Sequence, residues 1–94
     1  MEPRHVEGID RGHVLLYALS TCVWCKKTKR LLNELGVEYY YIDVDLLEGD
    51  DKKRIENDLS KWNARRSYPT IVVHNKKAII SFDEDEIREA LGDG

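Results

Sequence analysis

The chain is poor in the residues that build disulfide frameworks and in long apolar runs. It has two cysteines, two prolines and one methionine among 94 residues, and no apolar run approaches the roughly 18 residues needed to span a bilayer. The N-terminus also lacks the apolar core of a secretory signal peptide. We therefore expect a cytoplasmic protein with no membrane contact. In the cytoplasm a structural disulfide is a poor explanation for two cysteines that both lie in one C-x-x-C.

A strong excess of charge of either sign is also missing. Lys and Arg together number 15 and Asp and Glu together 18, which gives a net charge of -3. A nucleic-acid-binding domain would normally be basic, so we expect no nucleic-acid partner. Charged residues make up 35% and hydrophobic residues 41% of the chain, which is typical of a folded globular domain. A chain of this length suits a single domain.

The C-x-x-C pair, Cys22 and Cys25, lies where a predicted strand meets a predicted helix. A nearly continuous apolar stretch predicts a buried strand over residues 13–19, and leucines at helical spacing predict a helix over 23–35. Free N–H groups and the positive end of the helix dipole favour a thiolate on the first cysteine, and the thiolate is the reactive form. The second cysteine lies one turn inside the helix and can close a small disulfide ring. The pair is therefore predicted to be a redox dithiol.

The remaining elements predict a mixed sheet. A strand–helix–strand unit of this length favours a parallel strand pair with a right-handed crossover, and a short turn between two later strands favours an antiparallel hairpin. Residues 1–11 show no periodicity and are expected to be a flexible tail, which leaves residues 12–94 as the domain. The predicted fold class is α/β, in the order βαβαββα, with a four-stranded mixed sheet and helices on both faces. Beyond the first strand and helix, the expected elements are strands at 38–43, 70–74 and 78–82 and helices at 50–62 and from 83 onward.

Three features together resemble the glutaredoxins, within the thioredoxin superfamily. They are the sequence Thr21-Cys22-Val23-Trp24-Cys25 at the strand–helix junction, the sequence Tyr68-Pro69-Thr70 at the start of the third strand, and the order of the elements. The resemblance implies a thioredoxin-like fold and thiol–disulfide exchange, in which Cys22 attacks a disulfide and Cys25 resolves the mixed disulfide. It further implies that Pro69 is a cis-proline facing the dithiol and that Tyr68 offers its backbone to an extended substrate.

The resemblance also assigns substrate contacts to Trp24, Arg65 and Asp83. Trp24 keeps an aromatic residue between the cysteines, while Arg65 and Asp83 match positions that contact the carboxylate and the amino group of glutathione. Two other features depart from the family pattern: Leu19 stands where glutathione-binding members often have Lys, and Ile80-Ser81 stands where they have Gly-Gly. We therefore expect glutathione to be a poor electron donor. No bound cofactor is expected, and a low-molecular-weight thiol or a reductase is expected to restore the dithiol.

The dithiol has two alternative interpretations besides the expected enzyme. A closed structural zinc site needs four ligands, and only His5, His13 and His74 are left to complete one, all of them expected far from the cysteines. Some glutaredoxins that lack the proline of the motif hold an iron–sulfur cluster between two monomers, and Val23 in that position keeps this alternative open. We expect instead a monomer with no metal, which acts on disulfide-containing proteins or small thiols, with a reductase as a further candidate partner.

Some charged residues near the motif have an ordinary explanation. Asp43 ends a predicted strand and Asp45 comes shortly after it. Both are expected to be simple loop charges, because the rest of a calcium-binding pattern is missing. Lys26 and Lys27 either stabilise the thiolate or steer acidic partners, or they are solvated helix residues. The sequence leaves these possibilities open.

Overall fold

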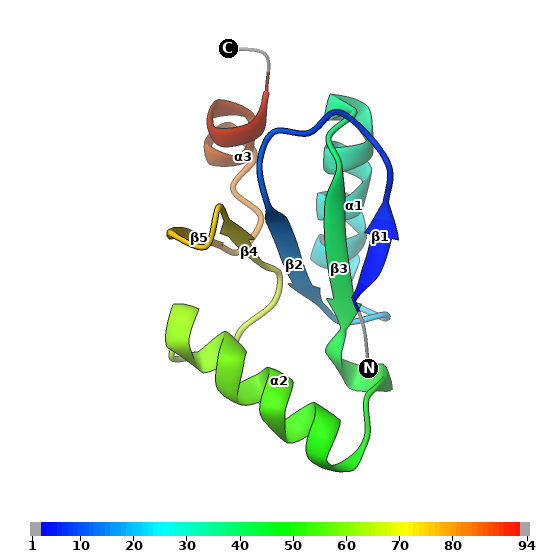
Figure 1. Cartoon of the computed structure of the whole chain (residues 1–94), viewed down its shortest axis with the longest axis vertical. Helices are drawn as coiled ribbons and strands as arrows, with labels where there is room; N and C mark the ends of the chain where they lie inside the picture. The colour runs from blue at the N-terminus through cyan, green and yellow to red at the C-terminus, as the bar shows by residue number, and fades with distance from the viewer. Residues whose placement is uncertain (1–2, 93–94) are drawn as a thin grey trace.

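The computed structural model describes residues 3–92 and has a single mixed sheet between two layers of helices (Figure 1). The strand order is β1-β3-β2-β4-β5; β2 and β3 are parallel, and all other neighbours are antiparallel. This confirms the predicted α/β order, with helices on both faces. In chain order the elements are β1 (Arg4–Val6), β2 (Val14–Ala18), α1 (Val23–Leu35), β3 (Tyr39–Asp43), the 3-10 helix η1 (Val44–Leu46), α2 (Gly49–Trp62), β4 (Thr70–Val73), β5 (Lys77–Ile80) and α3 (Glu84–Leu91).

The edge strand β1 corrects the expectation of a flexible tail over residues 1–11 and of a four-stranded sheet. Arg4–Val6 pairs with the free edge of β3, so the sheet has five strands. Further along, Ile9 donates its N–H to the Gly36 carbonyl at 2.7 Å, and its own carbonyl accepts from Glu38 at 2.9 Å. A three-residue strand is too short to show an alternating pattern, and its pairing partner lies far along the chain. The first two residues of the expected tail lie outside the described part.

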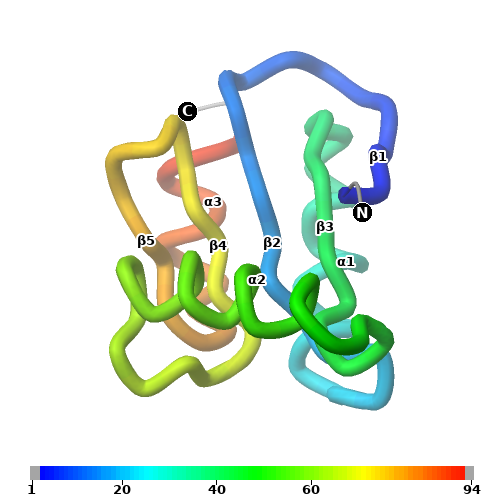
Figure 2. The backbone as a smooth tube through the Cα atoms, turned by 60° about the horizontal axis from the view of Figure 1, so that its bottom comes forward, coloured from blue at the N-terminus to red at the C-terminus, as the bar shows by residue number. Residues whose placement is uncertain are grey.

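The two faces of the sheet form two separate cores. The backbone shows α2 on one side of the strands and α1 and α3 on the other (Figure 2). Helices α1 and α3 cover one face, where Thr28, Leu31 and Leu32 of α1 are buried as the helical spacing predicts. Helix α2 covers the other face with Ile55 and Leu59. Within residues 3–92, no helix is both long and apolar enough to cross a bilayer.

The arrangement places the C-x-x-C at the carboxyl end of the central strand β2. β2 ends at Ala18, and α1 begins five residues later at Val23. Because β3 runs parallel to β2, with Asp43 opposite Ala18, both strands end at the same edge of the sheet. Residues that follow β3 are therefore carried to the loop that contains the first cysteine.

Candidate active site

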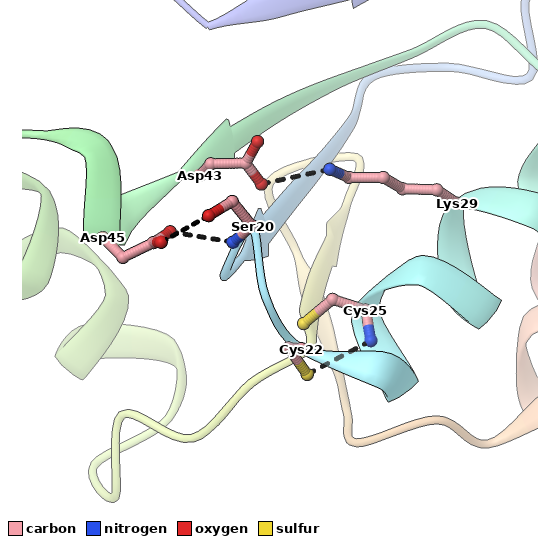
Figure 3. Close-up of polar contacts among 6 residues, drawn as sticks. All are labelled: Ser20, Cys22, Cys25, Lys29, Asp43 and Asp45. Atoms are coloured by element: carbon pink, nitrogen blue, oxygen red, sulfur yellow. Dashed lines mark hydrogen bonds and ion pairs between the residues drawn. The ribbon is translucent and has the colours of Figure 1, made fainter.

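The two cysteines share the first turn of α1. Cys22 is the N-cap residue, and its sulfur accepts the backbone N–H of Cys25 at 3.2 Å (Figure 3). Both are free thiols. A hydrogen bond donated to the sulfur and the positive end of the helix dipole both stabilise negative charge there. The geometry therefore suits a nucleophilic sulfur on Cys22.

The two thiols differ sharply in exposure. Cys22 is partly exposed, whereas Cys25 is fully buried in the core beneath it. Burial, together with a smaller contribution from the neighbouring Cys22 sulfur, raises the pKa of the Cys25 thiol to about 12. At neutral pH Cys25 keeps its proton and is screened from solvent. This difference supports Cys22 as the attacking residue and Cys25 as the resolving residue, which are roles predicted from the sequence.

The loop before β4 carries the expected proline in the cis conformation. The Tyr68–Pro69 bond is cis, and the buried Asn63 at the end of α2 organises the loop that leads to it. Asn63 Nδ2 donates to Ser67 Oγ at 2.9 Å and to Thr70 Oγ1 at 3.1 Å. Thr70 Oγ1 in turn donates to the Ser67 carbonyl at 2.9 Å. Asn63 was not among the residues singled out from the sequence, because its contacts lie in a loop without periodic pattern.

Tyr68 lies between the two cores. Its side chain packs against both clusters of buried residues. Burial raises the pKa of the Tyr68 phenol, with the Glu56 carboxylate as a smaller cause, so the phenol stays neutral at physiological pH. Within residues 3–92, neither the backbone N–H nor the carbonyl of Tyr68 forms a hydrogen bond. Both groups are thus available to an extended substrate, which is the role that the resemblance predicts.

Trp24 forms an exposed aromatic surface next to the dithiol. Its side chain is 53% exposed. The Lys27 Nζ lies 4.5 Å from the centre of its ring, and the Phe82 ring centre lies 5.8 Å away. These contacts hold the indole in place while leaving much of it open to a partner. Its part in substrate binding stays a prediction.

The other two predicted substrate contacts, Asp83 and Arg65, lie on the surface. The exposed Asp83 is the N-cap of α3, where its Oδ1 accepts the Glu86 N–H at 3.1 Å. The side chain of Arg65 is exposed and forms no hydrogen bond or ion pair within the described part of the chain. Neither side chain forms a hydrogen bond with Cys22 or Cys25 there. Their assignment to a thiol donor stays a prediction.

Two carboxylates that looked like ordinary loop charges contact the segment around the dithiol (Figure 3). Asp45 accepts two hydrogen bonds from Ser20, and Asp43 forms an ion pair with Lys29 on α1 at 3.0 Å. The parallel pairing of β2 with β3 was the signal that could have found them. Parallel strands end at one edge, so acidic residues at or just after the end of β3 must lie near the loop after β2.

The three histidines considered as zinc ligands are engaged away from the cysteines. The His13 ring stacks on the Tyr40 ring, and the His5 ring packs against Tyr40 in a tilted arrangement. The His74 ring bonds the Arg11 carbonyl at 2.6 Å. Residues 3–92 contain no group of three or more His, Cys, Asp or Glu side chains that could hold a metal ion.

Comparisons with known proteins agree with this geometry. Methanoredoxin from Methanosarcina acetivorans is 50% identical with a TM-score of 0.90, and the match covers 98% of this chain and 96% of that chain. The glutaredoxin from Methanosarcina mazei Go1 is 49% identical with a TM-score of 0.89, covering 98% of this chain and 89% of that chain. The curated glutaredoxin of Vernicia fordii is 27% identical over 70 residues, which are 74% of this chain and 65% of that protein.

The chain spans about two thirds of the length of the curated relatives it matches. A sequence model described as "Glutaredoxin" matches residues 14–79, from the first residue of β2 almost to the end of β5. That match covers well over half of the chain, and the solved structures share its thioredoxin-like fold. The chain therefore belongs to the glutaredoxin family.

Proposed function

We propose that this protein is a thiol–disulfide oxidoreductase that reduces protein or small-molecule disulfides. The Cys22 thiolate attacks one sulfur of the substrate disulfide, forms a mixed disulfide and releases the other sulfur as a thiolate, which takes up a proton. Cys25 then loses its proton and attacks the Cys22 sulfur. The second substrate thiolate leaves, and a Cys22–Cys25 disulfide remains. Two electrons pass from the dithiol to the substrate.

The observation that carries this proposal is the pairing of an accessible sulfur with a buried one on a single helical turn. The Cys22 sulfur is partly exposed and accepts the Cys25 N–H, while the Cys25 thiol is buried and keeps its proton. Only Cys22 can meet a substrate first. Cys25 can react only with a sulfur that is already bound to Cys22.

The direct test is the reduction of bis(2-hydroxyethyl) disulfide with dithiothreitol as electron donor. The parent protein should accelerate the reaction, and Cys22→Ser should abolish the acceleration. A parent protein that is no faster than the buffer would refute the proposed function. A variant of a remote surface residue, Asn57→Ala on α2, should behave as the parent does and controls for the effects of handling.

The electron donor follows from the positions that depart from the family pattern. Glutathione carries two carboxylates and an amine, and its binding needs several placed polar groups. Leu19 packs partly buried against the core on the α2 side and offers no charge, while Ile80 is 48% exposed and adds a side chain where glycine allows close approach. Each lost charged hydrogen bond is worth roughly 1.5–3 kcal/mol, and roughly 1.4 kcal/mol is tenfold in affinity. We infer that glutathione is a poor donor and that another low-molecular-weight thiol or a reductase does better.

Stopped-flow fluorescence of the oxidised protein tests the choice of donor. Trp24 lies between the cysteines in sequence and should report the opening of the disulfide, and a Trp62→Phe background removes the second tryptophan. Glutathione, other small thiols, and thioredoxin reductase with NADPH are compared at equal reducing equivalents. Leu19→Lys should speed glutathione selectively. Glutathione that matches or exceeds every other donor in the parent would contradict the inference.

The proposal includes a cytoplasmic monomer. A reducing compartment suits a dithiol that must be re-reduced after each cycle, and sedimentation together with cell fractionation would test both points. The iron–sulfur carrier alternative is not favoured by any contact among residues 3–92 or by the comparisons.

A further inference from the structure

The loop that carries Cys22 is fastened to the end of β3 by one carboxylate. Ser20 donates its backbone N–H to Asp45 Oδ1 at 2.8 Å and its hydroxyl to Asp45 Oδ2 at 2.5 Å (Figure 3). Ser20 lies two residues before Cys22, and Asp45 lies 25 residues further along, in η1 directly after β3. Both carboxylate oxygens of Asp45 thus accept hydrogen bonds from a single residue of the loop that carries Cys22.

The loop itself is short and has few other fixed points. Four residues, 19–22, join β2 to α1. Within them, the Cys22 N–H donates to the Leu19 carbonyl at 3.2 Å. On the far side, Cys22 is fixed by the first turn of α1, where its carbonyl accepts the Lys26 N–H at 3.0 Å. The two hydrogen bonds that Ser20 donates to Asp45 therefore tie the upstream half of this loop to the end of β3.

We propose that Asp45 is a positioning residue for Cys22. By holding Ser20, it keeps the Cys22 sulfur in line with the Cys25 N–H and turned toward an incoming disulfide. The inference rests on the proposed function, since positioning serves the attack of Cys22 on a substrate. Asp45 acts through Ser20 and is not itself a group that touches the reacting sulfur atoms.

The charge state of Asp45 fits this role. The two hydrogen bonds from Ser20 hold the pKa of the Asp45 carboxyl below its ordinary value. The carboxylate is therefore ionised at neutral pH, and both oxygens can accept. Asp45 is exposed and is not part of the core. Its substitution therefore removes the hydrogen bonds with Ser20 without opening a cavity.

Positioning and simple electrostatics predict effects of opposite sign. A carboxylate near a cysteine disfavours the thiolate, so the loss of its charge alone would make Cys22 more reactive. Loss of positioning would make Cys22 less reactive, because small misplacements of reacting groups slow a reaction strongly. The direction of the change in rate therefore separates the two explanations.

The experiment measures the reactivity of Cys22 alone, in a Cys25→Ser background at pH 7. Two uncharged reagents are used, iodoacetamide and bis(2-hydroxyethyl) disulfide, so that steering by charge does not contribute. Asp45→Ala should slow both reactions about tenfold, within the roughly hundredfold that a 1 Å misplacement can produce. Ser20→Ala keeps the carboxylate and the backbone bond and should slow them about threefold.

A matched control is Asp58→Asn, which removes a half-exposed carboxylate paired with Lys61 on α2 and should leave both rates unchanged. The double variant Ser20→Ala/Asp45→Ala should be no slower than Asp45→Ala, because both changes break the same contact. Urea unfolding of each variant verifies that it is folded. If Asp45→Ala does not fold, the reaction rates of Ser20→Ala still test the proposal.

The two proposals fail in different ways. If the Cys25→Ser protein that keeps Ser20 and Asp45 reacts with iodoacetamide but not with the disulfide, the proposed function is wrong. The alkylation rates alone then test whether Asp45 positions Cys22. If Asp45→Ala reacts within twofold of the parent, or faster, in both reactions, Asp45 does not position Cys22. If the effects of Ser20→Ala and Asp45→Ala add up in the double variant, the two residues act separately. That result would refute the proposal that Asp45 positions Cys22 through Ser20.

Discussion

Asn63→Ala should destabilise the protein and disturb the loop that presents Tyr68. The buried Asn63 amide makes three good hydrogen bonds: two from Nδ2, at 2.9 and 3.1 Å, and one to Oδ1 from the Arg65 N–H at 3.1 Å. Each bond contributes about 0.5–1.5 kcal/mol net. The Arg65 N–H lies in an exposed part of the loop and can turn to water, so we expect a loss of about 2–3 kcal/mol.

That loss should lower the melting temperature by about 10–20 °C, because about 1 kcal/mol shifts a domain of this size by roughly 4–8 °C. Thermal and urea unfolding of Asn63→Ala measure it, with Asn57→Ala on the exposed face of the same helix as the control. The variant should also slow exchange with protein disulfides more than it slows alkylation of Cys22, since the α1 turn is untouched. An Asn63→Ala protein as stable as Asn57→Ala would refute the account of the loop.

Three further outcomes are expected. In Cys22→Ser, iodoacetamide should label Cys25 very slowly at pH 8 and faster as pH rises, because burial raises the pKa of the Cys25 thiol; rapid labelling at pH 8 would contradict the burial. Since an unfolded thiol ionises near about 8.5, the free energy of unfolding should fall as pH rises above that value. Gly36→Ala should lower the free energy of unfolding by about 1–2 kcal/mol, since Gly36 ends α1 at φ 69° with open space around an added Cβ, and urea titration would show it. Ser81→Gly should raise the free energy of unfolding by up to about 1 kcal/mol, because Ser81 has φ 70°; no gain on urea titration would show that its hydroxyl or backbone contacts offset the strain.

The parts of the fold set by local pattern were predictable from the sequence. The helix α1 begins and ends at the expected residues, because its leucine stripe and the Gly36 stop are both local signals. The cis-proline was expected from the resemblance, and the structure has it. In each case the information lies within a few neighbouring residues or in a short motif.

The features that could not be predicted depend on contacts between distant segments. β1 is three residues long and is a strand only because β3 offers a free edge. Asp45 contacts Ser20 across 25 residues, and the local sequence around Asp45 is an ordinary acidic loop. Asn63 is polar in a loop yet buried, since Ser67 and Thr70 satisfy its amide. Burial and long-range pairing decide these roles, and neither follows from periodicity.

The central claim is that Cys22 attacks first and Cys25 resolves. The most direct measurement is intact-mass spectrometry of the Cys25→Ser and Cys22→Ser proteins after each is mixed with a disulfide-containing target protein. Cys25→Ser should accumulate one stable mixed disulfide, which peptide mapping assigns to Cys22, because the buried resolving thiol is gone. Cys22→Ser should accumulate none. A Cys22→Ser protein that traps the target, or a Cys25→Ser protein that does not, would contradict the account.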